Sequence, residues 1–223
     1  LDANFIDQDY YWTPFTQLPI VFVYNRNLVN PSSAPRIWED LFQEGWKGKI
    51  AFADMEKSGT SYTIISTMAQ LFDEEPEDVL VRFYKQLDGN ILSSSGDVIT
   101  EVSNGNCLIG ITLEETALKA IDAGSNIVMV IPNDGTSAVP DGIAMLKNAP
   151  HSYNAGKFID FVVGHDTQSY AMTQFNRRSV RLDVKLTPKF DEITLIDFDI
   201  AKSAEDEEKV LDKWRSLMEG DDE

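Results

Sequence analysis

Apolar and polar positions along the chain alternate between two spacings. Continuous apolar runs of strand length occur at residues 18–25, 49–54, 107–112 and 126–132. After the second run, apolar residues recur at the i, i+3, i+4 and i+7 spacing of one helical face, namely at Ile64, Ile65, Met68, Ala69 and Phe72. Because strand and helix patterns follow one another repeatedly, the sequence predicts an α/β sheet with helices on its faces.

Residues that start and stop helices place the remaining elements. A first-turn proline and a glycine stop indicate a short helix within residues 32–45, and similar signals bound helices within 74–90, 96–104 and 113–124. Beyond residue 134 the pattern predicts a strand at 143–147, two helices within 149–176, a basic turn at 177–181 and a charged helix within 197–223. The expected buried side of that last helix consists of Val210, Leu211, Trp214, Leu217 and Met218. A domain boundary is expected near residues 131–134.

A cluster of small hydroxyl residues lies where the strand at 49–54 gives way to a helix. Ser58, Thr60 and Ser61 are all suitable helix caps, and capping is the common use of such residues. The first turn of a helix also leaves about four backbone N–H groups without partners, at the positive end of the helix dipole. With Gly59 allowing close approach to the backbone, the cluster is suited either to capping alone or to binding an anion.

Two further features are expected at the same edge of the sheet. A second hydroxyl cluster opens the helix after residues 93–96, and a turn at 111–115 follows the next strand. Ligands of open α/β sheets collect beyond the carboxyl ends of the strands. The convergence of these features favours an anion site over capping alone.

The charge balance narrows the classes of partner. The formal net charge of −18 opposes binding to a nucleic-acid backbone, which depends on clustered Lys and Arg. Cys107, the single cysteine, lies in an apolar run and excludes a disulfide framework or a cysteine-rich metal site within one chain. His151 and His165, both near helix starts, fit capping or surface roles better than ligation. We predict no cofactor and no bound metal.

Neither a membrane helix nor a signal peptide is recognisable in the sequence. The apolar runs fall well short of the roughly 20 residues that a membrane helix needs. The chain opens at "LDANF" without an initiating Met, and we expect the natural N-terminus to lie elsewhere.

Long stretches of the chain resemble the extracellular solute-binding proteins of ABC importers. The most specific stretches are "DLFQEGWKGKIAFAD" at 40–54 and "PDGIAMLKNA" at 140–149, with the sequence that continues to "RRSV" at 177–180. The similarity runs nearly end to end and is closest to the group of ferric-iron, sugar-phosphate and aminoalkylphosphonate binders. The resemblance implies a non-enzymatic carrier outside the cytoplasm, either periplasmic or anchored to the cell surface as a lipoprotein. Its expected partners are a small anionic solute and the membrane permease of an importer.

The fold implied by the resemblance is the two-lobed α/β type 2 periplasmic-binding-protein fold, with the ligand between lobes joined by two crossing strands. Family members carry more chain before the position of Leu1. On that basis, residues 14–132 are expected to form the complete second lobe, and 1–13 with 133–223 the hinge and an incomplete first lobe. An incomplete sheet exposes edges and apolar surface. We therefore expect dimerisation, a domain swap or a separate N-terminal fragment.

The resemblance also bears on the ligand. In the iron binders, adjacent tyrosines follow the strand equivalent to "CLIGI", whereas this chain has Thr112, Leu113, Glu114 and Glu115 there. The family's anion-binding turn is retained at 58–61. The combination favours a small molecule that carries a phosphate or phosphonate. The predicted ligand-binding residues are Ser58, Gly59, Thr60, Ser61, Ser94, Ser95, Thr112, Glu114, Trp12 and Asp134.

For two of these residues the alternative is a structural role, ordinary packing for Trp12 and a first-turn helix acid for Glu114. Arg177 and Arg178 resemble a basic pair of the family that we interpret as structural support. The alternative function is capture of ferric iron or another cation by Glu114 and Glu115 with an anion as co-ligand. A hydrolase or transferase has no support, since the sequence contains neither a G-x-S-x-G elbow nor a P-loop.

Overall fold

The computed structural model describes residues 1–220. By packing, the chain divides into two compact units. Unit 1 consists of Leu1–Pro19 and Ala138–Glu192, and unit 2 consists of Ile20–Ser137 and the described residues from Ile193 onward. The predicted first-lobe segment 133–223 thus ends on residues that lie outside the described part of the chain.

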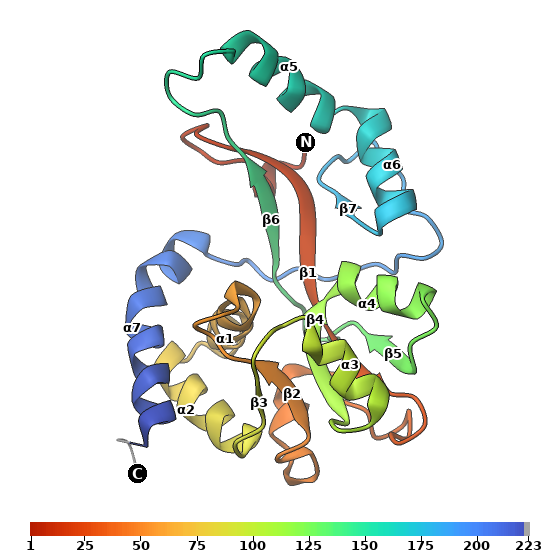
Figure 1. The fold of residues 1–223 in the computed structure, drawn as a ribbon, viewed down its shortest axis with the longest axis vertical. Helices are drawn as coiled ribbons and strands as arrows, with labels where there is room; N and C mark the ends of the chain where they lie inside the picture. The colour runs from red at the N-terminus through yellow and green to blue at the C-terminus, as the bar shows by residue number, and fades with distance from the viewer. Residues whose placement is uncertain (221–223) are drawn as a thin grey trace. The chain divides into compact units, whose positions relative to one another are not determined.

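The sheet of unit 2 positions the predicted hydroxyl clusters. Its strand order is β3-β2-β4-β1-β5 (Figure 1), with the bounds β1 Thr13–Asn25, β2 Ile50–Ala53, β3 Ile91–Leu92, β4 Ile109–Leu113 and β5 Ile127–Val130. Strand β2 runs parallel to both β3 and β4, whereas β1 is antiparallel to β4 and β5. The carboxyl ends of β3, β2 and β4 therefore lie at one edge of the sheet.

Each of these three strands leads into a helix. Helix α1 (Gly59–Phe72) follows β2, α3 (Asp97–Asn104) follows β3 and α4 (Glu114–Asp122) follows β4, while α2 (Pro76–Leu87) lies between α1 and β3 in the sequence. The alternation of strands and helices that the sequence predicted is confirmed in this unit. The helix starts consequently meet at the edge where the parallel strands end.

The core of unit 2 is rich in aromatic side chains. The rings of Phe22 and Trp38 meet edge to face with centroids 4.9 Å apart, and Phe52 contacts Phe83 in the same way at 5.2 Å. All four side chains are almost completely buried. Burial of side chains of this size contributes about 1.5–3 kcal/mol each to folding, and the edge-to-face contacts add to it.

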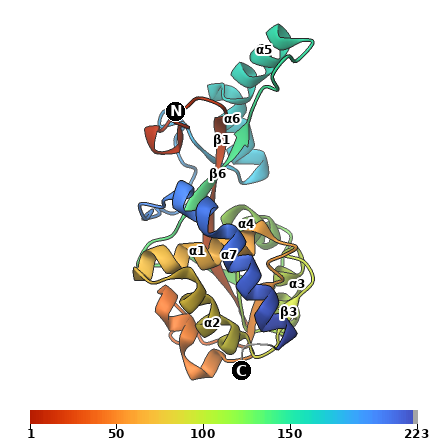
Figure 2. The ribbon, with the colours of Figure 1, turned by 90° about the vertical axis from the view of Figure 1, so that its left-hand side faces the viewer.

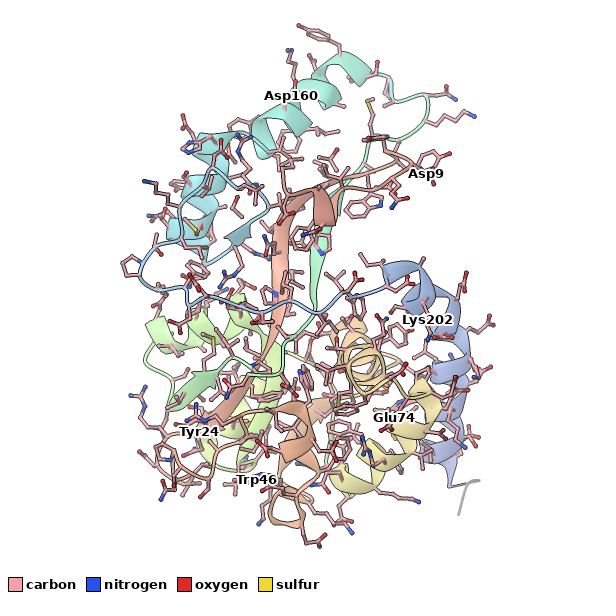
Figure 3. All side chains as sticks on the ribbon, turned by 180° about the vertical axis from the view of Figure 1, so that it is seen from behind. Asp9, Tyr24, Trp46, Glu74, Asp160 and Lys202 are labelled. Carbon is pink, nitrogen blue, oxygen red and sulfur yellow. The ribbon has the colours of Figure 1, made fainter. Side chains whose placement is uncertain are left out.

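Helix α7 (Ile200–Glu219) belongs to unit 2. Its N-cap residue Asp199 accepts a hydrogen bond from the backbone N–H of Lys202, at 2.9 Å. Val210, Trp214 and Leu217 are buried in the same core as β2. The helix packs on α1 and α2, as Figure 2 shows, and the segments that carry Lys202 and Glu74 lie beside each other in Figure 3.

The position of α7 departs from the predicted domains. Residues 193–223 were assigned to the first lobe, whereas the residues described after 192 pack with unit 2 because Trp214 fills its core. The predicted buried face of this helix is correct at its centre. Met218 is exposed. It lies in the last turn of the helix, where Leu217 is the last buried residue.

The residues at 32–45 form 3₁₀ turns rather than the predicted short helix. The turns are η2 (Trp38–Phe42) and η3 (Glu44–Trp46). The side-chain amide of Gln86 donates to the carbonyl oxygens of Leu41 and Gln43, each at 2.8 Å. These carbonyls would otherwise accept bonds from the next turn of an α-helix, so the tertiary contact replaces the helical bonds.

Unit 1 is built around the first half of β1, which pairs with β6 (Ala138–Ile143) and β7 (Arg178–Ser179). The predicted strand at 143–147 is wrong, because the register pairs Pro19 with Ala138 and Thr13 with Ile143, so the partner strand ends there. The two helices predicted within 149–176 are present as α5 (Ser152–Val162) and α6 (His165–Phe175). A short 3₁₀ turn, η1 (Ala3–Phe5), precedes β1.

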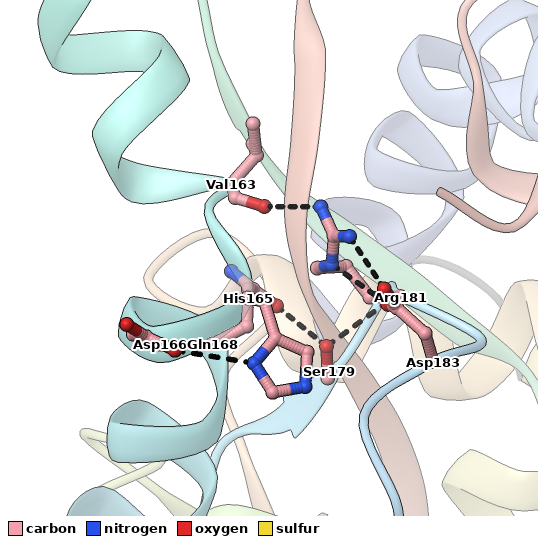
Figure 4. Close-up of polar contacts among 7 residues, drawn as sticks. All are labelled: Val163, His165, Asp166, Gln168, Ser179, Arg181 and Asp183. Carbon is pink, nitrogen blue, oxygen red and sulfur yellow. Dashed lines mark hydrogen bonds and ion pairs between the residues drawn. The ribbon is translucent and has the colours of Figure 1, made fainter.

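The basic turn of unit 1 ties its elements together. Arg181 donates to the carbonyl oxygen of Val163 at 3.0 Å and pairs with Asp183 at 2.7 Å (Figure 4). In the same view, Ser179 donates to the side-chain oxygen of Gln168. Arg177 pairs with Asp141 on β6 at 2.6 Å. These contacts are of the structural kind expected for the basic residues.

Within residues 1–220, no helix combines the length and the apolar character needed to cross a membrane.

Candidate functional site

A hollow of about 110 Å³ lies in unit 2 at the edge where the parallel strands end. The ends of β2 and β4 and the first turns of α1, α3 and α4 surround it. Its lining residues are Ala53, Thr60, Ser61, Ile64, Ser95, Gly96, Val98, Ile111, Thr112, Leu113 and Thr116. Hydroxyl-bearing residues from three helix starts thus line one small space together with apolar residues.

The α1 wall combines a helix-capping residue with backbone N–H groups that have no partner in the described protein. Ser58 is the N-cap residue, and its hydroxyl oxygen accepts a hydrogen bond from the backbone N–H of Ser61 at 3.2 Å. Within residues 1–220, the backbone N–H groups of Gly59 and Thr60 have no protein acceptor. Gly59 leaves open space where a side chain would be. An oxyanion can therefore approach these two N–H groups at the positive end of the helix dipole.

The α3 wall has the second hydroxyl cluster. Ser94 is exposed, and its hydroxyl oxygen accepts a hydrogen bond from the N–H of Gly96 at 3.2 Å, which shapes the turn. Ser95 is half-buried and lines the hollow together with Gly96. In this wall, Ser94 stabilises the turn and Ser95 lines the space.

The α4 wall adds Thr112 and Thr116. Thr112 is buried near the end of β4, and Thr116 lies in the first turn of α4. Glu114, the first residue of this helix, is also buried, at 1% exposure. A carboxylate in the first turn is stabilised by the helix dipole, so Glu114 suits its position independently of any ligand.

The electrostatics of the hollow depend on backbone dipoles. None of the described residues that line it carries a formal charge. An ion pair between Lys57 and Asp54, at 2.8 Å, lies close in the sequence to the lining residues of α1. Burial raises the pKa of Asp54, but hydrogen bonds from Lys57, Trp214 and the N–H of Glu56 outweigh that effect, so the pKa lies below its usual value.

The structure brings together some of the predicted ligand-binding residues. Thr60, Ser61, Ser95 and Thr112 line the hollow, and Ser58 and Gly59 adjoin it in the sequence. The carboxylate of Asp134 instead accepts a hydrogen bond from the backbone N–H of Trp38, at 3.0 Å. Trp12 lies in unit 1, where its ring packs against Gly142. The proposed ligand contacts of these two residues remain predictions.

Two lining positions at the helix starts, Gly96 and Thr116, were not among the predicted ligand-binding residues. Gly96 was assigned only to the second cluster as a whole, and Thr116 was not considered. Thr116 lies four residues beyond Thr112, in the first turn of the helix that follows the strand. A hydroxyl in that turn is the same signal that identified the residues of α1, and it would have revealed this one.

The carboxylates predicted for a cation site do not form a recognisable cluster. Among the described residues, no group of three or more His, Cys, Asp and Glu side chains is arranged to hold a metal ion. Glu115 is half-buried beside Glu114 in the first turn of α4.

Residues 2–203 match the family described as bacterial extracellular solute-binding protein. The chain belongs to this family. The match confirms the resemblance noted in the sequence, and the extracytoplasmic location that the resemblance implied agrees with the family's description. Members of this kind are carriers and not enzymes, as predicted.

Curated relatives differ in what their names say they bind. The chain is 24% identical to a probable ABC transporter periplasmic-binding protein, y4fP, of Sinorhizobium fredii, over 79% of this chain and 51% of the relative. It is 26% identical to iron uptake protein A1 of Synechocystis, over 71% and 47%. It is 22% identical to a putative 2-aminoethylphosphonate-binding periplasmic protein of Salmonella typhi, over 80% and 54%. The chain therefore spans about half the length of these relatives.

Solved structures share the fold. The periplasmic binding protein P5PA is 26% identical with a TM-score of 0.78, and the match covers 94% of this chain and 69% of that one. AfuA from Actinobacillus pleuropneumoniae, solved with fructose-6-phosphate, is 24% identical with a TM-score of 0.76, over 96% and 73%. These similarities confirm the α/β fold of the periplasmic binding proteins.

Proposed function

We propose that this chain is the ligand-binding part of a solute-binding protein that captures a small phosphate- or phosphonate-bearing anion and delivers it to the permease of an ABC importer. The ligand's oxyanion binds at the start of α1, on the N–H groups of Gly59 and Thr60. The hydroxyls of Ser95, Thr112 and Thr116 bind the remaining oxygens. The importer partner is supported by the relative named as an ABC transporter periplasmic-binding protein.

The observation that carries the proposal is the convergence of three helix starts on one hollow without a lining carboxylate. Helix starts provide unpaired N–H donors, and hydroxyl groups add donors that rotate to suit the ligand. The volume of about 110 Å³ suits a phosphate-sized group. The net charge of −18 is compatible with this role, because surface charges farther away than about 8 Å are screened at physiological salt.

The test is calorimetric titration of the purified protein with inorganic phosphate, 2-aminoethylphosphonate, fructose-6-phosphate and ferric citrate. Saturable binding of a phosphate- or phosphonate-bearing compound is expected. Heat with ferric citrate alone would reject the proposal.

The variant Thr60→Asp gives the sharpest prediction for the site. It places a carboxylate beside the donors of the α1 start, so anion binding should be lost while Ser58 still caps the helix. Thr100→Asp is the matched control, since it makes the same substitution at an exposed position of α3, outside the residues that line the hollow. Equal loss of affinity in both variants, or none in Thr60→Asp, contradicts the assigned site.

Capture of ferric iron is the second candidate function, and it is favoured by the relative named iron uptake protein A1. On this chain the metal would bind through Glu114 and Glu115, with an anion at the α1 start as co-ligand. Oxygen ligands of this type suit a hard cation. Glu114→Gln should then abolish the heat of ferric citrate binding and leave phosphate binding intact.

A further inference from the structure

Asp54 connects two walls of the hollow. Its backbone N–H donates to the carbonyl oxygen of Leu92 at 2.8 Å, directly before the second hydroxyl cluster. Its side-chain Oδ1 accepts the backbone N–H of Glu56 at 3.1 Å, and its carbonyl accepts the N–H of Lys57 at 3.1 Å. These bonds shape the turn that leads into Ser58. The position of Asp54 therefore sets where both the α1 start and the α3 start lie.

Helix α7 holds the side chain of Asp54 from the other side. The indole N–H of Trp214 donates to Oδ1 of Asp54 at 2.9 Å. Trp214 is fully buried, and its ring packs edge to face on Phe52 and Tyr84, with centroids 6.1 and 5.7 Å away. The adjacent Arg215 pairs with Glu56 at 2.7 Å. Two consecutive residues of α7 thus hold Asp54 and Glu56, which belong to the same turn.

These donors lie outside the part of the chain that matches the family. The match ends at residue 203, whereas Trp214 and Arg215 lie further along α7. Polar contacts also hold the first turns of α7 to α1, since Ser66 donates to Ser203 at 2.9 Å and Gln70 donates to the carbonyl of Asp199 at 3.0 Å. The helix is therefore attached along its length to the elements that carry the site.

We propose that Trp214, acting through Asp54, is a positioning residue for the anion site of unit 2. This inference rests on the proposed function. Trp214 contacts no lining residue of the hollow by hydrogen bond, and its effect is to fix the carboxylate that shapes the turn before α1. A binding group must be held within about 0.5 Å of its productive position, which requires a supporting shell of this kind.

A purely structural role for Trp214 makes a different prediction. In that case its substitution lowers the melting temperature but leaves the dissociation constant for the ligand unchanged at temperatures where the protein is folded. If Trp214 positions Asp54, loss of the indole N–H alone moves the α1 donors and weakens binding. The two roles are separated by measuring affinity well below the melting temperature.

The test uses Trp214→Phe, which retains an aromatic ring in the core and removes the N–H. Titration with inorganic phosphate and 2-aminoethylphosphonate should show an increase in the dissociation constant of about fivefold. This increase corresponds to the loss of one hydrogen bond worth about 1 kcal/mol. The matched control is Trp46→Phe. Trp46 is also buried in unit 2, and its indole N–H has no acceptor within residues 1–220, so binding should stay within about twofold.

A double-variant cycle tests the route through Asp54. Asp54→Ala alone should weaken binding, and adding Trp214→Phe should weaken it little further, because either change by itself removes the hydrogen bond from the indole N–H of Trp214 to Oδ1 of Asp54. If Trp214→Phe yields too little folded protein, Arg215→Gln tests the same turn from the surface, and a raised dissociation constant is expected.

The outcomes separate this inference from the proposed function. If the wild-type protein binds the anion and Trp214→Phe binds it with the same affinity, the inference is overturned and the proposed function stands. The same holds for Arg215→Gln where it replaces Trp214→Phe. Fully additive effects in the cycle also overturn it. Absence of anion binding by the wild-type protein overturns the proposed function and this inference with it.

Discussion

At the scale of single residues, the site depends on which polar groups already form hydrogen bonds within the protein. Ser58 and Ser94 use their hydroxyl oxygens to accept backbone N–H groups, whereas Thr60, Ser61, Ser95 and Thr112 line the hollow. Sequence alone identified these hydroxyl clusters, because helix caps and anion-binding turns use the same residue types. It did not separate the capping residues from the lining ones, since that division depends on backbone geometry.

Asp54 gives a prediction for the pH dependence of stability. Hydrogen bonds from Lys57, Trp214 and the N–H of Glu56 outweigh burial and hold the pKa of its carboxyl below the value of about 3.9 found in an unfolded chain. The stabilisation is therefore fully present above about pH 4 and is lost as the pH falls through the lower, folded-state pKa.

Asp54→Asn should accordingly lower the free energy of unfolding by about 1 kcal/mol at pH 7, since the charge-assisted bonds weaken. The difference from wild type should shrink as the pH falls below 4. Urea unfolding at a series of pH values checks this. A difference that is constant with pH would show that the charge of Asp54 contributes nothing.

At the scale of elements, the close packing of α3 against the sheet positions the second hydroxyl cluster. Gly110 on β4 leaves no room for a side chain, because a Cβ there would lie 2.7 Å from Val98, 2.9 Å from Val102 and 3.0 Å from Val23. The helix that starts after Ser95 can therefore approach β4 only at a glycine.

Gly110→Ala should destabilise the protein by about 1–3 kcal/mol, because the added methyl group overpacks this interface. Gly45→Ala is the control, since nothing lies within 4 Å of a Cβ at that position. Chemical denaturation of both variants measures the effect. Equal stability of Gly110→Ala and wild type would mean that α3 shifts freely away from β4, contrary to its assigned role.

The elements also show why parts of the fold were predictable. Apolar runs identified β2 and β4, which are buried almost throughout, and helical periodicity identified α1 and α4, which bury apolar side chains. The failures occurred where distant residues decide the local structure. Gln86 converts a predicted helix into 3₁₀ turns, and pairing with the first half of β1 moves a predicted strand to Ala138–Ile143.

At the scale of the whole molecule, the alternation of strands and helices predicts the α/β class, and parallel β2, β3 and β4 explain why helix starts converge. The membership of α7 in unit 2 could not be read from the sequence. Its periodicity shows that Trp214 faces a core, but not which core. Family membership likewise does not specify the ligand, because relatives of similar sequence bear names that specify iron and 2-aminoethylphosphonate.

The most direct measurement is a crystal structure of the protein with a phosphate- or phosphonate-bearing solute. The account predicts an oxyanion about 2.7–3.2 Å from the backbone nitrogens of Gly59 and Thr60, with hydroxyls of Ser95 or Thr112 on its other oxygens. A solute bound away from the α1 start, with those N–H groups paired to protein acceptors instead, would contradict it.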